Sequence, residues 1–387
     1  MIPVYLGATA AISIFLICRL PRFLRSIPPK RTAMRVSEIY VYPIKSLRAT
    51  QLTSALATTH GFQYDRRFML LEVTPNGLKN MAVAHYPVMT QFLTSIDFDK
   101  KGSSTITVTF QSPGHKDDLR TLKIPLLPNT EELEPLDISM HASPTKSFKM
   151  PNEYSKWFSE CFGYEVVFVY LGDNRRNVLF QELAPAKTAS WVSTITKSIP
   201  LFNSISTADH RIGFADCAPY LVTSKTSLAN VSERLPEGQD MDMTKFRPNI
   251  VIEGAKEPWE EDFWRKIKVG DSDLVMMHNC VRCKSINIDY ATGKPGTNGS
   301  GEVLKRLQKD RRIDKGAKWS PVFGRYSFWG EGNAEKVLKV GDQVRVAEVN
   351  KERTVWCMLM SRILLSLPQS ANTPQPGQVY HKSILRI

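Results

Sequence analysis

The residues best suited to chemistry are two cysteines, Cys280 and Cys283, which lie three positions apart with Arg282 directly before the second. A thiolate is the form of cysteine that attacks other groups and binds metals, and a neighbouring guanidinium lowers the pKa of the thiol because it stabilises that anion. Cys283 could therefore bind a metal ion, carry sulfur, exchange a disulfide with Cys280 or pack as a buried residue.

Two of these possibilities, a structural zinc site and a redox dithiol, are disfavoured by the surrounding sequence. A closed zinc site needs four ligands, and His278 and the scattered cysteines at positions 161, 217 and 357 form no second ligand pair. A thioredoxin-like CxxC motif stands at a helix N-terminus. Residues 284–289 instead alternate between polar and apolar side chains, which predicts a strand. Metal ligation, sulfur transfer and simple burial remain open.

The composition is that of a folded chain of about two domains, because 387 residues with 42% hydrophobic content can bury a sizeable core. The net charge of +13 is compatible with nucleic-acid binding, but no zinc-finger, RRM or helix-turn-helix pattern accompanies it. We therefore expect no nucleic-acid partner. Six cysteines in so long a chain are no disulfide framework, which indicates a reducing compartment.

The N-terminus predicts a membrane anchor. Residues 2–18 carry no charge and are followed by five basic residues between positions 19 and 31, whereas a cleavable signal peptide has its positive charge before the apolar run. Because basic flanks stay in the cytosol, we expect residues 1–34 to form an uncleaved transmembrane helix and a basic linker, with the globular part in the cytosol. A short anchor of this kind fits the mitochondrial outer membrane, with the endoplasmic reticulum as the alternative.

Hydrophobic periodicity predicts an α+β fold that is mainly β. Strand-like segments occur at 36–42, 68–73, 105–110, 122–125, 165–170, 249–253, 266–269, 274–277 and 343–349. Helical segments occur at 155–162 and 224–235, the latter with Ser224 as a candidate N-cap. Many short strands and few helices favour a barrel-rich architecture.

Eight short motifs occur in one order along the chain, and together they resemble the MOSC-domain proteins, most closely the membrane-anchored mitochondrial amidoxime-reducing component family. The motifs are Tyr42-Pro-Ile-Lys-Ser, Tyr64-Asp-Arg-Arg-Phe, Phe246-Arg-Pro-Asn-Ile-Val, Trp259-Glu-Glu-Asp-Phe-Trp, Cys280-Val-Arg-Cys, Asp289-Tyr-Ala-Thr-Gly, Pro321-Val-Phe-Gly-Arg-Tyr and Val340-Gly-Asp. The resemblance implies an N-terminal β-barrel-like domain over residues 35–172 and a MOSC β-barrel with flanking helices over 173–350. Residues 173–212 are then a loop at the start of the second domain, and residues 351–387 a divergent tail.

The resemblance also implies a molybdenum cofactor, a pterin dithiolene with a terminal phosphate, whose metal takes the Cys283 thiolate as its protein ligand. The softness of sulfur agrees with such a metal, and Cys280 is then a neighbour that does not coordinate. The phosphate needs positive charge and fixed donors. The residues that match the family's cofactor-binding positions are Lys45, Ser46, Arg66, Arg247, Asn249, Val281 (through its backbone), Arg282 and Tyr326.

By the same resemblance, the protein is an oxidoreductase that removes oxygen from small N-hydroxylated substrates such as amidoximes and N-hydroxylamines. The sequence has no dinucleotide-binding fingerprint and no iron–sulfur cysteine set, so the electrons must come from a separate donor. In the family this donor is a b-type cytochrome with its NADH-dependent flavin reductase. The basic residues of segment 305–318 could dock an acidic cytochrome. Two alternatives remain: a sulfur carrier or sulfurtransferase with a persulfide on Cys283, and a cofactor-binding carrier without turnover.

Overall fold

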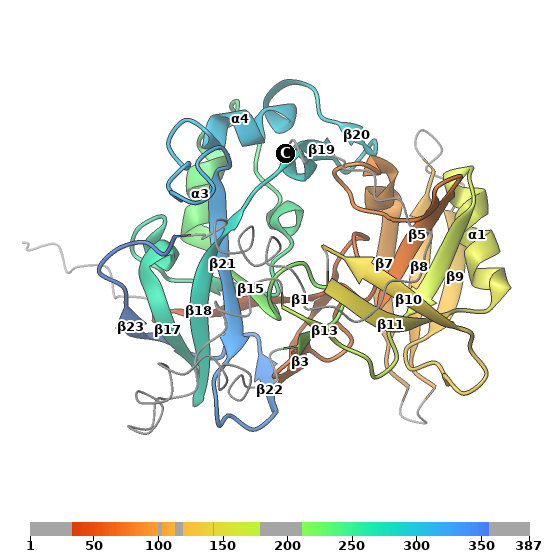
Figure 1. Cartoon of the computed structure of the whole chain (residues 1–387). Coiled ribbons are helices and arrows are strands. Elements are labelled where there is room, and N and C mark those ends of the chain that lie inside the picture. The colour runs from red at the N-terminus through yellow and green to blue at the C-terminus, as the bar shows by residue number, and fades with distance from the viewer. Residues whose placement is uncertain (1–32, 100–102, 113–118, 142, 179–210, 356–387) are drawn as a thin grey trace, which may run out of the picture. The chain divides into compact units, whose positions relative to one another are not determined.

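The protein is mainly β, as the sequence predicts. The computed structural model describes residues 33–99, 103–112, 119–141, 143–178 and 211–355, and within them strands far outnumber helices (Figure 1). The predicted transmembrane segment and the apolar part of the tail lie outside the described residues. In the ranges that are described, no helix is both long enough and apolar enough to cross a membrane.

The largest sheet joins segments from both ends of the described chain. Its eight strands are β1 (Arg35–Val41), β2 (Thr50–Leu52), β15 (Tyr220–Ser224), β16 (Ile250–Glu253), β17 (Trp264–Val269), β18 (Ser272–Val281), β21 (Val322–Trp329) and β23 (Val344–Val349). They lie in the order β2-β1-β16-β15-β21-β18-β17-β23, and all neighbours are antiparallel except β15 and β16. Because β1 and β16 run antiparallel, the residues after β1 lie beside those before β16.

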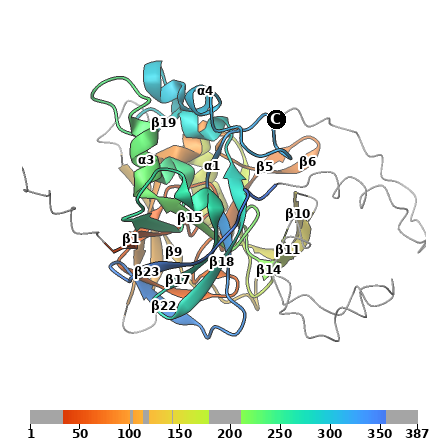
Figure 2. The ribbon, with the colours of Figure 1, turned by 90° about the vertical axis from the view of Figure 1, so that its left-hand side faces the viewer.

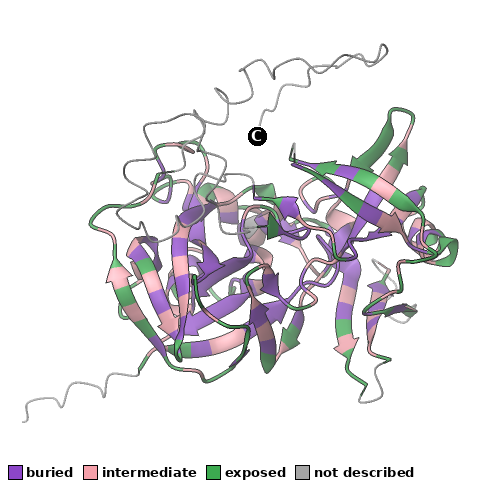
Figure 3. Ribbon diagram, turned by 60° about the horizontal axis from the view of Figure 1, so that its bottom comes forward, coloured by how far each residue is buried: buried purple, intermediate pink, exposed green. Residues whose placement is uncertain are grey.

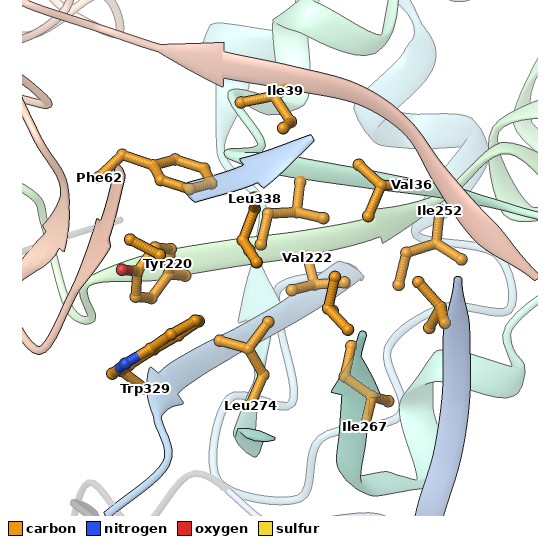
Figure 4. Close-up of a cluster of buried hydrophobic side chains, with 14 of the residues drawn as sticks. Val36, Ile39, Phe62, Tyr220, Val222, Ile252, Ile267, Leu274, Trp329 and Leu338 are labelled. Atoms are coloured by element: carbon orange, nitrogen blue, oxygen red, sulfur yellow. The ribbon is translucent and has the colours of Figure 1, made fainter. Parts of the chain in front are cut away.

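The main core of this sheet is built from side chains that its strands send to one face. Side chains of a strand point alternately to its two faces, so Tyr220 and Val222 of β15 reach the same cluster. Figure 4 labels ten members of this cluster, namely Val36, Ile39, Phe62, Tyr220, Val222, Ile252, Ile267, Leu274, Trp329 and Leu338. The Tyr220 hydroxyl donates to the carbonyl oxygen of Thr58 (2.6 Å) and accepts from its amide (2.9 Å). This packing fixes the strand ends from which the candidate site is built.

Two further sheets enclose a second core. Their strands are β5 (Phe68–Thr74), β6 (Gly77–Asn80), β7 (Phe92–Asp97), β8 (Thr105–Gln111), β9 (Leu119–Pro125), β10 (Pro135–Met140), β11 (Ser143–Lys149) and β12 (Val166–Tyr170). The five-stranded sheet has the order β10-β11-β12-β5-β6, and the three-stranded sheet the order β7-β8-β9. Buried residues alternate with less buried ones along β8 and β11, whereas β5 and β12 are buried along most of their length (Figure 3 colours the ribbon by burial). The helix α1 (Asn152–Phe162) adds Phe158 to the core that they share.

The remaining strands are short. A three-stranded sheet is formed by β3 (Ser54–Thr58), β4 (Gly61–Phe62) and β22 (Lys336–Lys339). Two-stranded pairs are formed by β13 (Arg176–Asn177) with β14 (Arg211–Ile212), and by β19 (Ile288–Asp289) with β20 (Lys294–Pro295). The first pair joins the two ends of the predicted loop at 173–212, of which residues 179–210 lie outside the described part of the chain.

The helices after residue 211 gather at one end of the large sheet (Figures 1 and 2). They are α3 (Lys225–Ser232), α4 (Val303–Leu307) and the 3-10 helices η4 (Met243–Phe246), η5 (Glu260–Phe263), η6 (Lys284–Asn287) and η7 (Asn298–Gly301), while η1 (Pro87–Gln91) lies earlier in the chain. Val231, Val303 and Leu307 join one buried cluster. The predicted N-cap is confirmed, since the Ser224 hydroxyl accepts from the backbone amides of Thr226 and Ser227.

A buried ion-pair network connects η5 with the segment before β21. Arg311 donates from its two terminal nitrogens to the two carboxylate oxygens of Asp262, both at 2.9 Å, and Arg353 Nε donates to one of them at 3.1 Å. This network corrects one expectation from the sequence. Arg311 belongs to the basic segment 305–318, but it is only 3% exposed. It neutralises a buried carboxylate and cannot face a partner protein.

Glu261, next to that network, predicts a pH-dependent stability. The side chain is fully buried, and among the residues that the structure describes only one carboxyl oxygen has a side-chain partner, the Ser227 hydroxyl at 2.8 Å. Burial raises the pKa of Glu261 to about 7. The stabilising contribution of the protonated group is therefore complete below the unfolded pKa, near 4.5, and is lost as the pH rises to 7. The loss is at most about 3 kcal/mol.

We expect Glu261→Gln to unfold with nearly the wild-type free energy at pH 5 and to be more stable than the wild type at pH 8. Free energies of unfolding by urea at the two pH values measure the effect. The exposed Glu257→Gln, four residues earlier, should show no such pH-dependent gain. An identical difference between Glu261→Gln and wild type at both pH values would show that Glu261 does not titrate in this range.

Candidate functional site

Cys283 lies where the long strand β18 has ended. The strand places Cys280 in the core of the sheet, 3% exposed, and stops at Val281. Cys283 is the only exposed cysteine among the four that the structure describes, and its sulfur lies 3.2 Å from the Ser285 hydroxyl oxygen. The two cysteines of the motif are therefore unequal, and only Cys283 presents its thiol to a ligand from outside.

The strand predicted after Cys283 is wrong. Residues 284–287 form the 3-10 helix η6, with Cys283 as its N-terminal flank, and only a two-residue strand follows. The alternating pattern has another cause: Ile286 packs with the α3 and α4 residues, whereas Ile288 packs in the core of the N-terminal sheets. The sequence argument against a dithiol therefore fails. Burial of Cys280 is what distinguishes it from Cys283.

Tyr326 interacts with two thiols, those of the partly buried Cys217 and the buried Cys280. Its hydroxyl is hydrogen-bonded to the side chains of Cys217 and Cys280. Burial raises the pKa of Cys217 to about 12 and also raises the pKa of Cys280. Both thiols therefore stay protonated at neutral pH and are poor metal ligands. Cys217 was not singled out from the sequence, because nothing local to it distinguishes it.

Arg282 holds the cysteine loop in place. Its side chain donates to the Phe246 carbonyl oxygen (2.7 Å) and to that of Phe323 (3.0 and 2.5 Å). Its backbone amide donates to Pro321 O (2.8 Å), which continues the pairing of Val281 with Val322. Arg282 thus joins the end of β18 to β21 and to the residue before Arg247. Its contacts position Cys283.

Lys45 and Ser46 follow β1 and are buried. Lys45 Nζ donates to the Phe214 carbonyl oxygen (3.2 Å) and forms an ion pair with Asp216. Burial lowers the pKa of Lys45, and the Asp216 carboxylate partly offsets this effect. The Ser46 hydroxyl points to Met81 O at 3.4 Å. Asp216 is a site residue that the motifs did not include.

Arg66, Arg247 and Asn249 meet beside Tyr42. Arg66 pairs with Asp65, donates to the Asn249 side-chain oxygen (3.3 Å) and donates to the Arg247 carbonyl oxygen (3.3 Å). The two guanidinium carbons lie 4.6 Å (Arg66) and 4.3 Å (Arg247) from the centre of the Tyr42 ring. These residues come from three separate motifs, and the pairing of β1 with β16 brings them together.

Both polar atoms of the Asn249 side-chain amide form hydrogen bonds within the protein. Its oxygen accepts from Arg66 and from the Leu221 backbone amide (3.2 Å), and its nitrogen donates to the Tyr40 carbonyl oxygen (3.2 Å). It therefore ties β1 to β15 and orients Arg66.

The backbone at this site is strained. In the described ranges six non-glycine residues have a positive φ, and four of them lie here, namely Ser46 (69°), Tyr64 (71°), Arg66 (50°) and Arg247 (55°). Each such residue costs about 1–2 kcal/mol. Strain of this kind persists where surrounding contacts over-determine the backbone, and it concentrates at ligand sites.

The predicted residues form two groups that meet. The first group holds Lys45, Ser46, Arg66, Arg247 and Asn249. Lys45 pairs with Asp216, and the two arginines lie over the Tyr42 ring. The second group, at the ends of β18 and β21, holds Val281, Arg282, Cys283 and Tyr326. The hydrogen bond from Arg282 to the residue before Arg247 joins the groups.

The first group also contains the buried Arg176, whose side chain donates to the Gly213 and Asp216 carbonyl oxygens (3.1 and 2.8 Å). Cations outnumber carboxylates, so an anionic ligand is favoured.

Comparisons with known proteins match two family models to the chain. The model of the MOSC domain matches residues 209–345, and that of the MOSC N-terminal beta barrel domain matches residues 33–165. The chain is 25% identical over 333 residues to mitochondrial amidoxime reducing component 2 of Macaca fascicularis, which covers 83% of this chain and 87% of the relative. It is 30% identical over 178 residues to the human mitochondrial amidoxime-reducing component 1, covering 41% and 50%.

A second kind of relative matches as well. The chain is 26% identical over 323 residues to the molybdenum cofactor sulfurase of Oryza sativa subsp. japonica, covering 80% of this chain and 35% of the relative. It therefore spans about a third of the length of that sulfurase.

Proposed function

The chain is a MOSC-domain protein with a MOSC N-terminal beta barrel domain, and on that premise we propose that it is a molybdenum-cofactor-dependent oxidoreductase that reduces small N-hydroxylated compounds. Amidoximes and N-hydroxylamines are the proposed substrate class. The observation that carries the proposal is the exposed Cys283 thiol after β18, whose neighbour Arg282 is hydrogen-bonded to the residue before Arg247 in the cluster of cations. The match to the amidoxime reducing component over 87% of that relative supports it.

The residues present fit a phosphate-bearing molybdenum cofactor. Cys283 offers one accessible soft ligand, Lys45, Arg66 and Arg247 offer positive charge, and the buried Tyr42 hydroxyl has no partner in the described chain. When bound, the cofactor would supply the two-electron oxygen-removing chemistry.

In this proposal the chain's own residues bind the cofactor and hold it in position. Cys283 is the ligand, and Lys45, Ser46, Arg66 and Arg247 hold the anionic end. Arg282 and Asn249 act indirectly, because their hydrogen bonds hold the backbone of the site in place. Val281 offers its backbone groups at the end of β18. Tyr326 forms hydrogen bonds with the thiols of Cys217 and Cys280.

Elemental analysis and turnover test the proposal together. The purified chain from a host that makes the cofactor should contain nearly one molybdenum atom per chain and should convert benzamidoxime to benzamidine when an NADH-driven cytochrome system is added. Molybdenum without turnover would favour a carrier.

A sulfur-transferring protein is the second candidate, because molybdenum cofactor sulfurases are among the relatives. Cys283 would then carry a persulfide. Sulfur that cyanide releases from the isolated wild type, and that Cys283→Ser lacks, would favour this role if benzamidoxime is not reduced.

We propose a b-type cytochrome, itself reduced by an NADH-dependent flavin reductase, as the electron donor. The anchor predicted at residues 2–18 and the mitochondrial names of the relatives support the mitochondrial outer membrane as location, with the folded part in the cytosol. The endoplasmic reticulum is the alternative.

A basic surface beside the cysteine loop is the proposed docking site for the donor. Its exposed members are Lys305, Lys309, Arg312, Lys315 and Lys318. The exposed Trp319 lies next to them, 69% accessible. This segment leads into β21 through Pro321, which pairs with Arg282 beside Cys283.

Reversing the charge of Lys309, Arg312 and Lys315 together is expected to slow electron transfer from the cytochrome about tenfold at low ionic strength, because complementary charge speeds encounter. Salt should affect the variant less than the wild type. The matched control reverses Arg120, Lys123 and Lys146, which are exposed on β9 and β11. The docking surface is refuted if both triple variants lose the same rate.

A further inference from the structure

One buried hydroxyl at the candidate site has no partner in the described part of the chain. Tyr42 lies directly after β1 and is fully buried, yet its hydroxyl oxygen makes no hydrogen bond with any described residue. Such groups are rare in folded proteins, because burial removes the hydrogen bonds to water without replacing them. An unpaired hydroxyl of this kind indicates a missing ligand.

The groups around the hydroxyl indicate the charge of that ligand. The guanidinium groups of Arg66 and Arg247 both lie over the Tyr42 ring at the distances given above. Arg247 donates one hydrogen bond, from Nη1 to Leu47 O (2.8 Å), and its other two nitrogens make none with the described residues. An acceptor with negative charge satisfies these free donors and the two cations together.

The hydroxyl itself is a donor at physiological pH. Burial raises the pKa of Tyr42 far above its ordinary value, and the two guanidinium groups only partly offset this effect. Tyr42 therefore keeps its proton and can donate it in a hydrogen bond to an oxygen acceptor.

We propose that Tyr42 is a ligand-binding residue whose hydroxyl donates a hydrogen bond to a phosphate-like oxyanion held by Arg66 and Arg247. Tyr42 is not among the residues that match the family's cofactor-binding positions. The inference rests on the proposed function only in identifying this oxyanion with the phosphate of the cofactor.

The test uses the full chain from a host that cannot make the cofactor, with inorganic phosphate as the probe. The unfolding temperature is followed as phosphate replaces chloride at constant ionic strength. Phosphate should stabilise the wild type. Tyr42→Phe should need about tenfold more phosphate for the same shift, because it lacks one charge-assisted hydrogen bond. Without phosphate it should unfold at or above the wild-type temperature, since the ring remains and the unsatisfied hydroxyl is gone.

Tyr40→Phe is the matched control. Tyr40 is a buried tyrosine two residues earlier, but its hydroxyl donates to the Glu38 carboxylate (2.8 Å). This variant should respond to phosphate as the wild type does. An equal response of wild type and Tyr42→Phe, or no stabilisation of the wild type by phosphate, overturns the assignment. The pterin content of the chain from a cofactor-producing host is measured separately, so loss of the proposed function and loss of this inference are distinguishable.

Discussion

Replacing Cys283 with serine is expected to remove molybdenum from the protein and to lower the rate of benzamidoxime reduction at least about a hundredfold. Loss of a residue that only orients a metal ligand costs about 10- to 100-fold, and loss of the ligand itself should cost more. A serine hydroxyl stays protonated and is hard, whereas the metal prefers a soft thiolate. No other described cysteine is exposed. Molybdenum per chain and the initial rate with a saturating electron donor measure the effect.

Cys280→Ser is the control, because it changes the same motif at a buried position. It should retain molybdenum and most of the activity, although the loss of a buried thiol beside Tyr326 lowers stability. A Cys283→Ser protein with full molybdenum and full activity would refute the ligand assignment. Equal losses in the two variants would point to a folding defect of the loop.

Replacing Arg311 with methionine is expected to destabilise the protein by about 3–5 kcal/mol. The substitution removes both hydrogen bonds at 2.9 Å from the Asp262 carboxylate and leaves only the one from Arg353. A carboxylate that stays buried without its main partner loses solvation that nothing replaces. The free energy of urea unfolding measures the effect.

The adjacent Arg312 offers a matched control, since it is exposed. Arg312→Met should change stability by about 0.5 kcal/mol or less. In the double variant Asp262→Asn with Arg311→Met, part of the loss should be recovered, because the buried carboxylate is gone and Arg353, which loses its ion pair, is 38% exposed. Equal stabilities of Arg311→Met and Arg312→Met would show that the buried pair does not stabilise the fold.

The site was only partly predictable from the sequence, and Lys45 shows why. Its motif marked it as a residue for a phosphate, and the structure buries it. The structure also pairs it with Asp216, which lies 171 positions away. No local pattern identifies such a partner, because the two residues meet only when the sheet has formed. Arg282 shows the same limit. Its motif did not reveal that its side chain donates hydrogen bonds to the carbonyl oxygens of Phe246 and Phe323.

The sequence by itself determined many of the local elements and the family, and it singled out Cys283, the cysteine that the structure shows to be exposed. Alternation of apolar residues predicted nine of the strands, but missed others such as β7, β11, β15 and β21. Ser224 predicted the start of α3. Both signals depend on neighbours within a few positions. Only the tertiary structure decided which charged groups are buried and what satisfies them. Arg311 was assigned to the surface from its charged neighbours, and 284–289 to a strand from its alternation, but contacts with distant residues outweighed both patterns. The contact of the Tyr42 ring with Arg247 follows from the same cause, since the pairing of β1 with β16 joins positions about 200 apart.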